Sequence, residues 1–217
     1  MRDTWHMWRR AVPLLFNGVV RLVGINLIWL VCSLPLITAG PATLAAYWWI
    51  ASDLRDENKE GYRAFFKAFT RLFWRGLVWL VGLAVVLFVA YANLVVWHRF
   101  LPPLTAALIQ VLAVYVVIFV LAMQPYLLEA LAVEGRPWGE ALKRSAWHVV
   151  TNPLYSHLNV LLPAIILGAA GLKTHTVIPL VLVAVVLGFM GYAAADVPQK
   201  YGMPSRKKQQ GKMEDLL

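Results

Sequence analysis

Few side chains in this sequence have the types and spacing that covalent or metal chemistry needs. The chain has five histidines, which are His6, His98, His148, His157 and His175. Their spacing is not that of metal ligands, and no glycine-rich phosphate-binding loop occurs. Four carboxylates, Asp53, Asp56, Glu57 and Glu60, stand among cations, a pattern typical of a solvated charged loop. We therefore predict that the protein is not an enzyme, with no catalytic residue, metal site or cofactor.

A second set of polar side chains lies within apolar stretches of the sequence. It consists of five amides: Asn26, Asn93, Gln110, Gln124 and Asn159. One interpretation is that these amides form hydrogen bonds between helices, worth about 0.6 kcal/mol each on average. The other is that they line a polar path for a solute. We favour the first, because no two of them have the spacing of an ion site.

The elements that must position these residues are apolar helices. A membrane-spanning helix needs about 20 apolar residues, and five runs meet or approach that length: 19–38, 76–97, 104–128, 154–171 and 177–195. A shorter segment, 41–55, begins at Pro41, a favoured first helical residue, and is predicted to be a short spanning or re-entrant helix. The prediction is an all-α membrane bundle of about six helices in three hairpins. The chain is 60% hydrophobic and only 14% charged, with a mean hydropathy of +0.65, whereas soluble domains carry about 25% charged residues.

The cations predict the orientation of this bundle. Of the 20 Lys and Arg residues, only Arg99 and Lys173 fall in the gaps assigned to one side, and the rest fall on the other. Short loops rich in Lys and Arg stay in the cytoplasm. We thus expect a multi-pass protein of the bacterial inner membrane with both termini cytoplasmic, a single transmembrane domain at 1–197 and a basic, disordered tail at 198–217. The net charge of +9 is attributed to contact with anionic lipid headgroups and not to nucleic acid.

Each hairpin is preceded by a basic, amphipathic segment. In the clearest, spanning 62–75, one face carries Tyr62, Phe65, Phe66, Phe69 and Phe73, and the other carries Arg63, Lys67 and Arg71. This pattern predicts an interfacial helix that lies flat with its aromatic face at the acyl boundary. Weaker copies are Trp5, Trp8, Val12, Leu15 and Phe16 near the N-terminus, and Trp138, Leu142 and Val149 in the second basic loop. Arg21 and Glu129 lie at the inner ends of predicted spans, where their side chains can reach the interface; an ion pair between them is an alternative.

One stretch resembles a known family. Its residues are Asn26, Trp29, Cys32, Leu34, Pro35, Thr38, Gly40, Pro41 and Ala42. In this order they resemble the signature of the YesL-like family, bacterial multi-pass membrane proteins classed as a domain of unknown function. The resemblance implies association with carbohydrate-uptake and polysaccharide-use systems. Physically, Leu34-Pro35 would end the first span, Thr38 and Gly40 would turn the chain, and Pro41 would start the return helix.

Three functions remain open from the sequence. The favoured one is a non-catalytic accessory protein that binds a transport or sensing complex. The second is a small-solute carrier or channel. The third is a membrane subunit of an ATP-driven importer, because Glu129-Ala130 with Gly135 resembles the Glu-Ala-Ala-x-x-x-Gly pattern of the coupling loop in such permeases. The Leu-Pro pair of that loop would fall near 147–148, where Trp147 and His148 stand instead.

Overall fold

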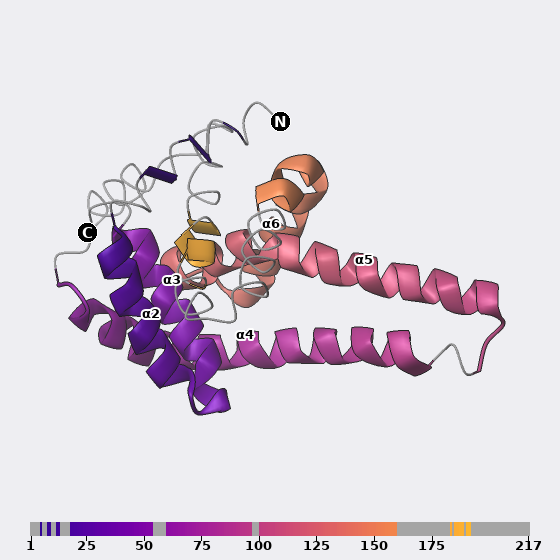
Figure 1. The fold of residues 1–217 in the computed structure, drawn as a ribbon, viewed down its shortest axis with the longest axis horizontal. Helices are drawn as coiled ribbons and strands as arrows, with labels where there is room; N and C mark the ends of the chain where they lie inside the picture. The colour runs from indigo at the N-terminus through magenta and orange to yellow at the C-terminus, as the bar shows by residue number, and fades with distance from the viewer. Residues whose placement is uncertain are drawn as a thin grey trace.

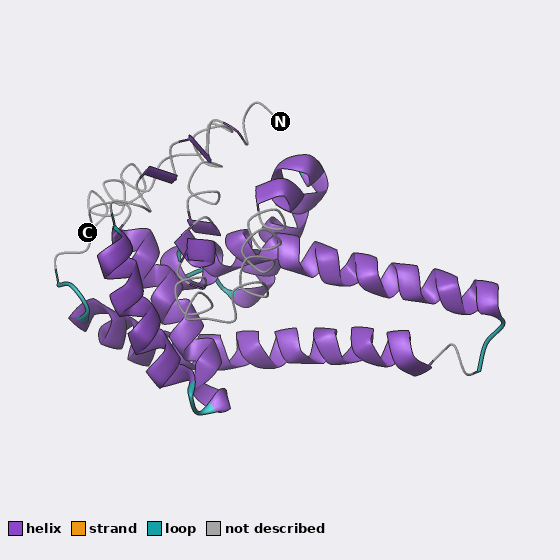
Figure 2. Cartoon of the chain, viewed as in Figure 1, coloured by secondary structure: helices purple, strands orange, loops and turns teal. Residues whose placement is uncertain are grey.

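The computed structural model of the chain describes residues 5, 8, 9, 12, 13, 18–53, 60–96, 100–159, 183, 185–188, 190 and 191. These residues form helices and connecting turns, without a strand among them (Figure 2). The elements are α2 (Val19–Ser33), the 3-10 turn η1 (Leu36–Thr38), α3 (Ala39–Asp53), α4 (Arg63–Val96), α5 (Pro103–Leu128), the π-helical turn η3 (Glu129–Val133) and α6 (Trp138–Thr151). A further helical stretch covers 153–159. The expected spans at 154–171 and 177–195 and the expected tail lie mostly or wholly outside the described residues.

Two antiparallel helices project from the rest of the molecule (Figure 1). We call residues 77–96 of α4 and 103–121 of α5 the arm, and the remaining described elements the base. The arm contains no Asp, Glu, Lys or Arg, and its large apolar side chains, including Val81, Phe88 and Leu108, are mostly exposed. Within the described residues, two helices are long and apolar enough to cross a membrane, Arg63–Val96 and Pro103–Val133. Each helix contributes about 30 Å of uncharged arm, which matches the hydrocarbon thickness of a bilayer.

Helix α3 is the buried centre of the base. Eleven of its residues are buried, among them Tyr47, Trp49 and Ile50. Helix α2 packs on one side through Leu22 and Ile25, and the first turns of α4 pack on another through Phe65 and Leu72. Leu128 and Leu131 close the cluster from α5 and η3. A short helix of alanines and aromatic residues lets three neighbours approach it closely.

The structure corrects the expected separation between interfacial helix and span. Residues 63–75 are the first turns of α4, which continues unbroken to Val96. Phe65 and Leu72 are buried against α3 and do not face outward, whereas Phe66 and Trp74 are exposed. An amphipathic pattern shows that one face of a helix packs against apolar material, but it does not tell whether that material is another protein helix or lipid. Likewise in α6, Val149 is buried while Trp147 and Val150 are exposed, so the predicted set of Trp138, Leu142 and Val149 does not share one outward face.

Candidate functional site

The hairpin formed by α2, η1 and α3 contains all nine signature residues. Trp29 on α2 donates its indole N–H to Thr43 Oγ1 on α3 at 3.1 Å, and Asn26 and Ala42 are buried. The Thr38 hydroxyl lies 2.6 Å from the carbonyl oxygen of Cys32 and 2.7 Å from that of Pro35. The single hydroxyl proton is shared between these two acceptors, and the Cys32 carbonyl is one of those left without a helical partner where α2 ends. These contacts assign the signature a part in holding the hairpin together.

Gly40 has a different place from the expected one. It lies within the first turn of α3, not at the turn between the helices. A Cβ atom at Gly40 would stand 2.2 Å from the carbonyl oxygen of Gly76, and one at Gly76 would stand 2.4 Å from the Pro41 backbone. The two glycines thus let the backbones of α3 and α4 touch. Gly24 similarly leaves room for the Tyr62 hydroxyl, which a Cβ there would approach to 2.2 Å.

Polar side chains join the helices where the arm meets the base. The Tyr47 hydroxyl lies 3.1 Å from Glu129 Oε2 and 3.3 Å from the Pro125 carbonyl oxygen. Trp79 on α4 donates to Gln124 Oε1 on α5 at 2.9 Å. The alternative pair of Arg21 with Glu129 does not form, because Arg21 pairs with Asp53 at 3.0 Å.

Arg75 holds the turn at the end of α5. Its guanidinium donates to the carbonyl oxygens of Leu131 and Gly135, each at 3.0 Å. Gly135 has φ +70°, which glycine adopts at little cost. The planar guanidinium can reach two carbonyls at once. Arg75 ends the segment 62–75 that the sequence predicts to be an interfacial helix. Its contact residues follow it by more than fifty positions, so no local signal could have revealed this role.

An ion network surrounds the turn between η3 and α6. Arg136 contacts Glu134 and Glu140, and Arg144 lies 3.2 Å from Glu134. The hydrogen bond with Glu134 raises the pKa of the Arg136 guanidinium above its ordinary value, against the opposing effect of burial. The network fixes the start of α6 and leaves Leu142, Trp147 and Val150 exposed along it. Among the residues that the structure describes, no three His, Cys, Asp or Glu side chains gather in a group that could hold a metal ion.

The five amides of the apolar stretches divide by their contacts. Asn93 donates within its own helix to Val89 O, while Gln110 donates across the arm to Leu94 O at 3.0 Å. Gln124 accepts from Trp79, and Asn159 accepts from the indole of Trp8 at 3.2 Å. Asn26, on α2, is buried. The amides are therefore spread along the arm and the base, and the structure does not bring all five together.

Comparison with known proteins agrees with the signature. The family model described as "Protein of unknown function, DUF624" matches residues 22–94. This segment carries the DUF624 domain. DUF624 is the YesL-like membrane protein family of unknown function, so the expected resemblance is confirmed. The match covers η1, α3 and most of α2 and α4. No curated protein and no solved structure matches the chain.

Proposed function

We propose that this DUF624 protein is a non-catalytic accessory component of the bacterial inner membrane, linked to carbohydrate uptake or utilisation. The arm anchors it by crossing the bilayer, both termini lie in the cytoplasm, and the base presents a binding surface to a transport or sensing complex. Support for the anchor comes from the exposed, uncharged arm, because so large an apolar surface is unstable in water. The carbohydrate link rests on the YesL-like resemblance.

The observation that carries the accessory role is that polar side chains in the base, and where the arm meets it, form hydrogen bonds between helices. Trp29 with Thr43 joins α2 to α3, Tyr47 with Glu129 joins α3 to η3, and Trp79 with Gln124 joins α4 to α5. Hydrogen bonds of this kind fix helices against each other. Three of the amides that a carrier would turn towards its solute are likewise engaged: Gln124 by Trp79, Gln110 by the Leu94 carbonyl oxygen and Asn159 by Trp8. Their engagement favours a rigid scaffold that binds a partner.

A second candidate, a membrane subunit of an ATP-driven importer, gains one observation. The segment 129–135 contains the π-helical turn η3 (Glu129–Val133), is held by Arg75, and connects a spanning helix to α6, one side of which is exposed. The coupling loop of an importer subunit would have to occupy such a position, next to a spanning helix and accessible to an ATPase. Glu129 itself accepts from Tyr47, however, and residues 147–148 still lack the Leu-Pro pair of the permease pattern.

Purification in mild detergent from its own host tests these roles. The tagged full chain is compared with Trp147→Ala, at an exposed α6 position, and with Leu104→Ala, an equally exposed position on the arm. We expect a component of a carbohydrate transport or sensing system to co-purify with the wild type and Leu104→Ala, and to be at least tenfold depleted with Trp147→Ala. An ATPase bound stoichiometrically and directly would favour the importer subunit. Recovery of no such component with any of the three would contradict both roles.

A further inference from the structure

The α2–η1–α3 hairpin lies beside the charged part of α4 and meets only the first turn of the arm, at Leu80. At one end of α3, Trp49 donates to Gly61 O at 2.8 Å and stacks on Tyr62 at 5.5 Å between ring centroids. At the other end, Gly40 touches Gly76, and a Cβ at Gly40 would stand 2.7 Å from Leu80 Cβ. Helix α3 therefore runs antiparallel to α4 between about residues 61 and 80.

This register conflicts with a hairpin that crosses the bilayer. The same length of α4 carries Arg63, Lys67, Arg71 and Arg75. If α3 spanned the membrane here, these four cations would be distributed through the hydrocarbon, where each Lys or Arg costs about 2.5–3.5 kcal/mol at the centre. The uncharged arm would then stand in water beyond the opposite face. A bilayer centred on the arm avoids both costs.

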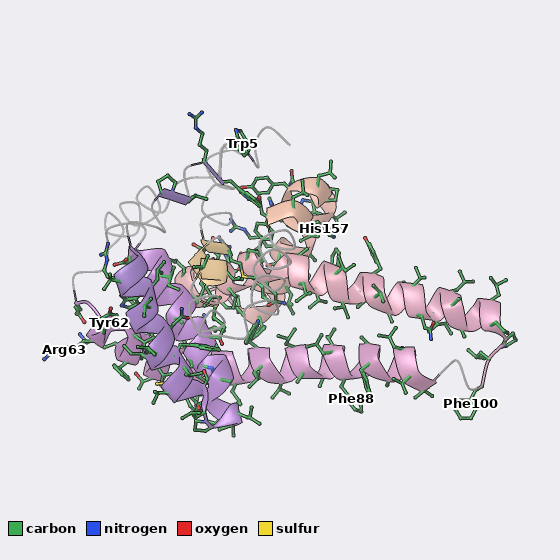
Figure 3. All side chains as sticks on the ribbon, viewed as in Figure 1. Trp5, Tyr62, Arg63, Phe88, Phe100 and His157 are labelled. Atoms are coloured by element: carbon green, nitrogen blue, oxygen red, sulfur yellow. The ribbon has the colours of Figure 1, made fainter. Side chains whose placement is uncertain are left out.

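The hairpin itself is polar at one end and apolar at the other. Arg21 and Asp53 form their ion pair at the open end, next to Tyr62, whose hydroxyl lies 3.4 Å from Arg21 O. At the closed end, Leu34, Leu36 and Ile37 are 74%, 84% and 61% exposed. This tip is uncharged and adjoins the arm at Leu80. Figure 3 shows Tyr62 and Arg63 at one end of α4 and Phe100 beyond the other, so the two ends of the α4–α5 hairpin are well separated.

We infer that the α2–η1–α3 hairpin is re-entrant: its tip, Leu34–Pro35–Leu36–Ile37, inserts into the acyl chains of the leaflet on the basic side and does not cross. We assign lipid as the surroundings of the tip because the tip is continuous with the exposed apolar arm. The assignment also follows from Trp74, which is 74% exposed beside Arg75, where a bilayer interface favours aromatic rings and cations together. Helices α2 and α3, each about 22 Å long, are also shorter than the hydrocarbon core.

The inference rests on the proposed crossing of the arm, and it changes the expected count of membrane helices. A re-entrant hairpin and a crossing hairpin both return the chain to the side from which it came. The sides assigned to all later loops therefore stay the same, while 19–38 and 41–55 cease to be spans.

Single-cysteine labelling in native membranes tests the inference. Cys32 is the only cysteine, so Cys32→Ser gives a background into which Ile37→Cys, Phe100→Cys, Val86→Cys or Gly139→Cys is placed. With a membrane-impermeant maleimide we expect Phe100→Cys to react only from outside and Gly139→Cys only from inside. Ile37→Cys and Val86→Cys should react at least tenfold faster after detergent is added. Leu36→Cys replaces Ile37→Cys if the latter does not fold.

A nitroxide on the same cysteines gives the depth. The depth of the label in the bilayer is measured from its collision rates with oxygen and with a water-soluble nickel complex. We expect the label at residue 37 to lie as deep as one at Val81 and less deep than one at Val86. Labelling of Ile37→Cys from outside at the rate of Phe100→Cys would show a crossing hairpin and overturn the inference. Labelling from inside at the rate of Gly139→Cys would place the tip in water and overturn it too. Failure of Phe100→Cys to react from outside would instead refute the proposed crossing of the arm.

Discussion

At the scale of single residues, the backbone contact at Gly40 and Gly76 leaves no room for a Cβ atom at either position. Gly76→Ala would place a Cβ atom 2.4 Å from the Pro41 backbone, which cannot move aside as a flexible side chain can. We expect the helices to separate and stability to fall by about 3 kcal/mol, the upper end of ordinary overpacking. Thermal unfolding of the purified protein in detergent measures this loss.

Gly82 provides the matched control for that substitution. It lies on the same helix, and a Cβ there would meet nothing within 4 Å. Gly82→Ala should therefore leave the unfolding midpoint unchanged or raise it slightly, because alanine favours a helix. Equal losses for the two variants would mean that the contact between α3 and α4 does not exist in solution.

The signature shows how far residue patterns alone could go. Its place at the end of one helix and the start of the next was predictable, because proline and glycine punctuate helices. The contacts of the Thr38 hydroxyl with the carbonyl oxygens of Cys32 and Pro35 agree with the expected turn. The role of Gly40 was not predictable, since a glycine at a turn and a glycine at a helix crossing look the same in sequence, and its partner Gly76 is far along the chain.

At the scale of elements, Arg75 connects the start of the arm to the turn η3. Replacing it with methionine removes two charge-assisted hydrogen bonds to carbonyls, each of a class worth about 1.5–3 kcal/mol when buried, less here because the side chain is half-buried. Lysine has no planar fork and should retain only part of the effect. We expect unfolding midpoints in the order wild type, Arg75→Lys, Arg75→Met, with faster proteolysis within 134–137.

A substitution at Arg63 serves as the comparison, because that side chain is exposed at the start of the same helix. Arg63→Met should leave both the midpoint and the proteolysis rate near those of wild type. If Arg75→Met behaved like Arg63→Met, the guanidinium would not be holding the turn.

Helix boundaries illustrate what periodicity can and cannot fix. The runs predicted at 76–97 and 104–128 agree closely with the end of α4 at Val96 and with α5 at Pro103–Leu128. The expected break near residue 75 is absent, because neither Arg75 nor Gly76 ends a helix once its neighbours favour one. The helical pattern of the aromatic residues in 62–75 was correct, but the surface they pack on, α3, depends on contacts that sequence alone does not specify.

At the scale of the whole molecule, the distribution of cations predicts which side each loop occupies. A reporter fused after Leu217 should be cytoplasmic, and one inserted near Lys173 or at 100–102 should be exported, because Lys and Arg retain short loops inside. Paired reporters, one active only inside and one only outside, measure this directly. Opposite results at all three positions would show that the orientation is inverted. If only the reporter at 100–102 gave the expected result, the predicted topology of the C-terminal third would be wrong.

The unbroken course of α4 has a mechanical consequence. Its 34 residues make a rod about 51 Å long, stiffened near one end by close backbone contact with α3. A tilt of about 10° at Arg63 would sweep the far tip through about 9 Å, by the geometry of such a rod. Any ligand that tilted α4 where it packs in the base would therefore displace the far end of the arm. Because the helix is unbroken, this displacement would need no series of side-chain rearrangements along it.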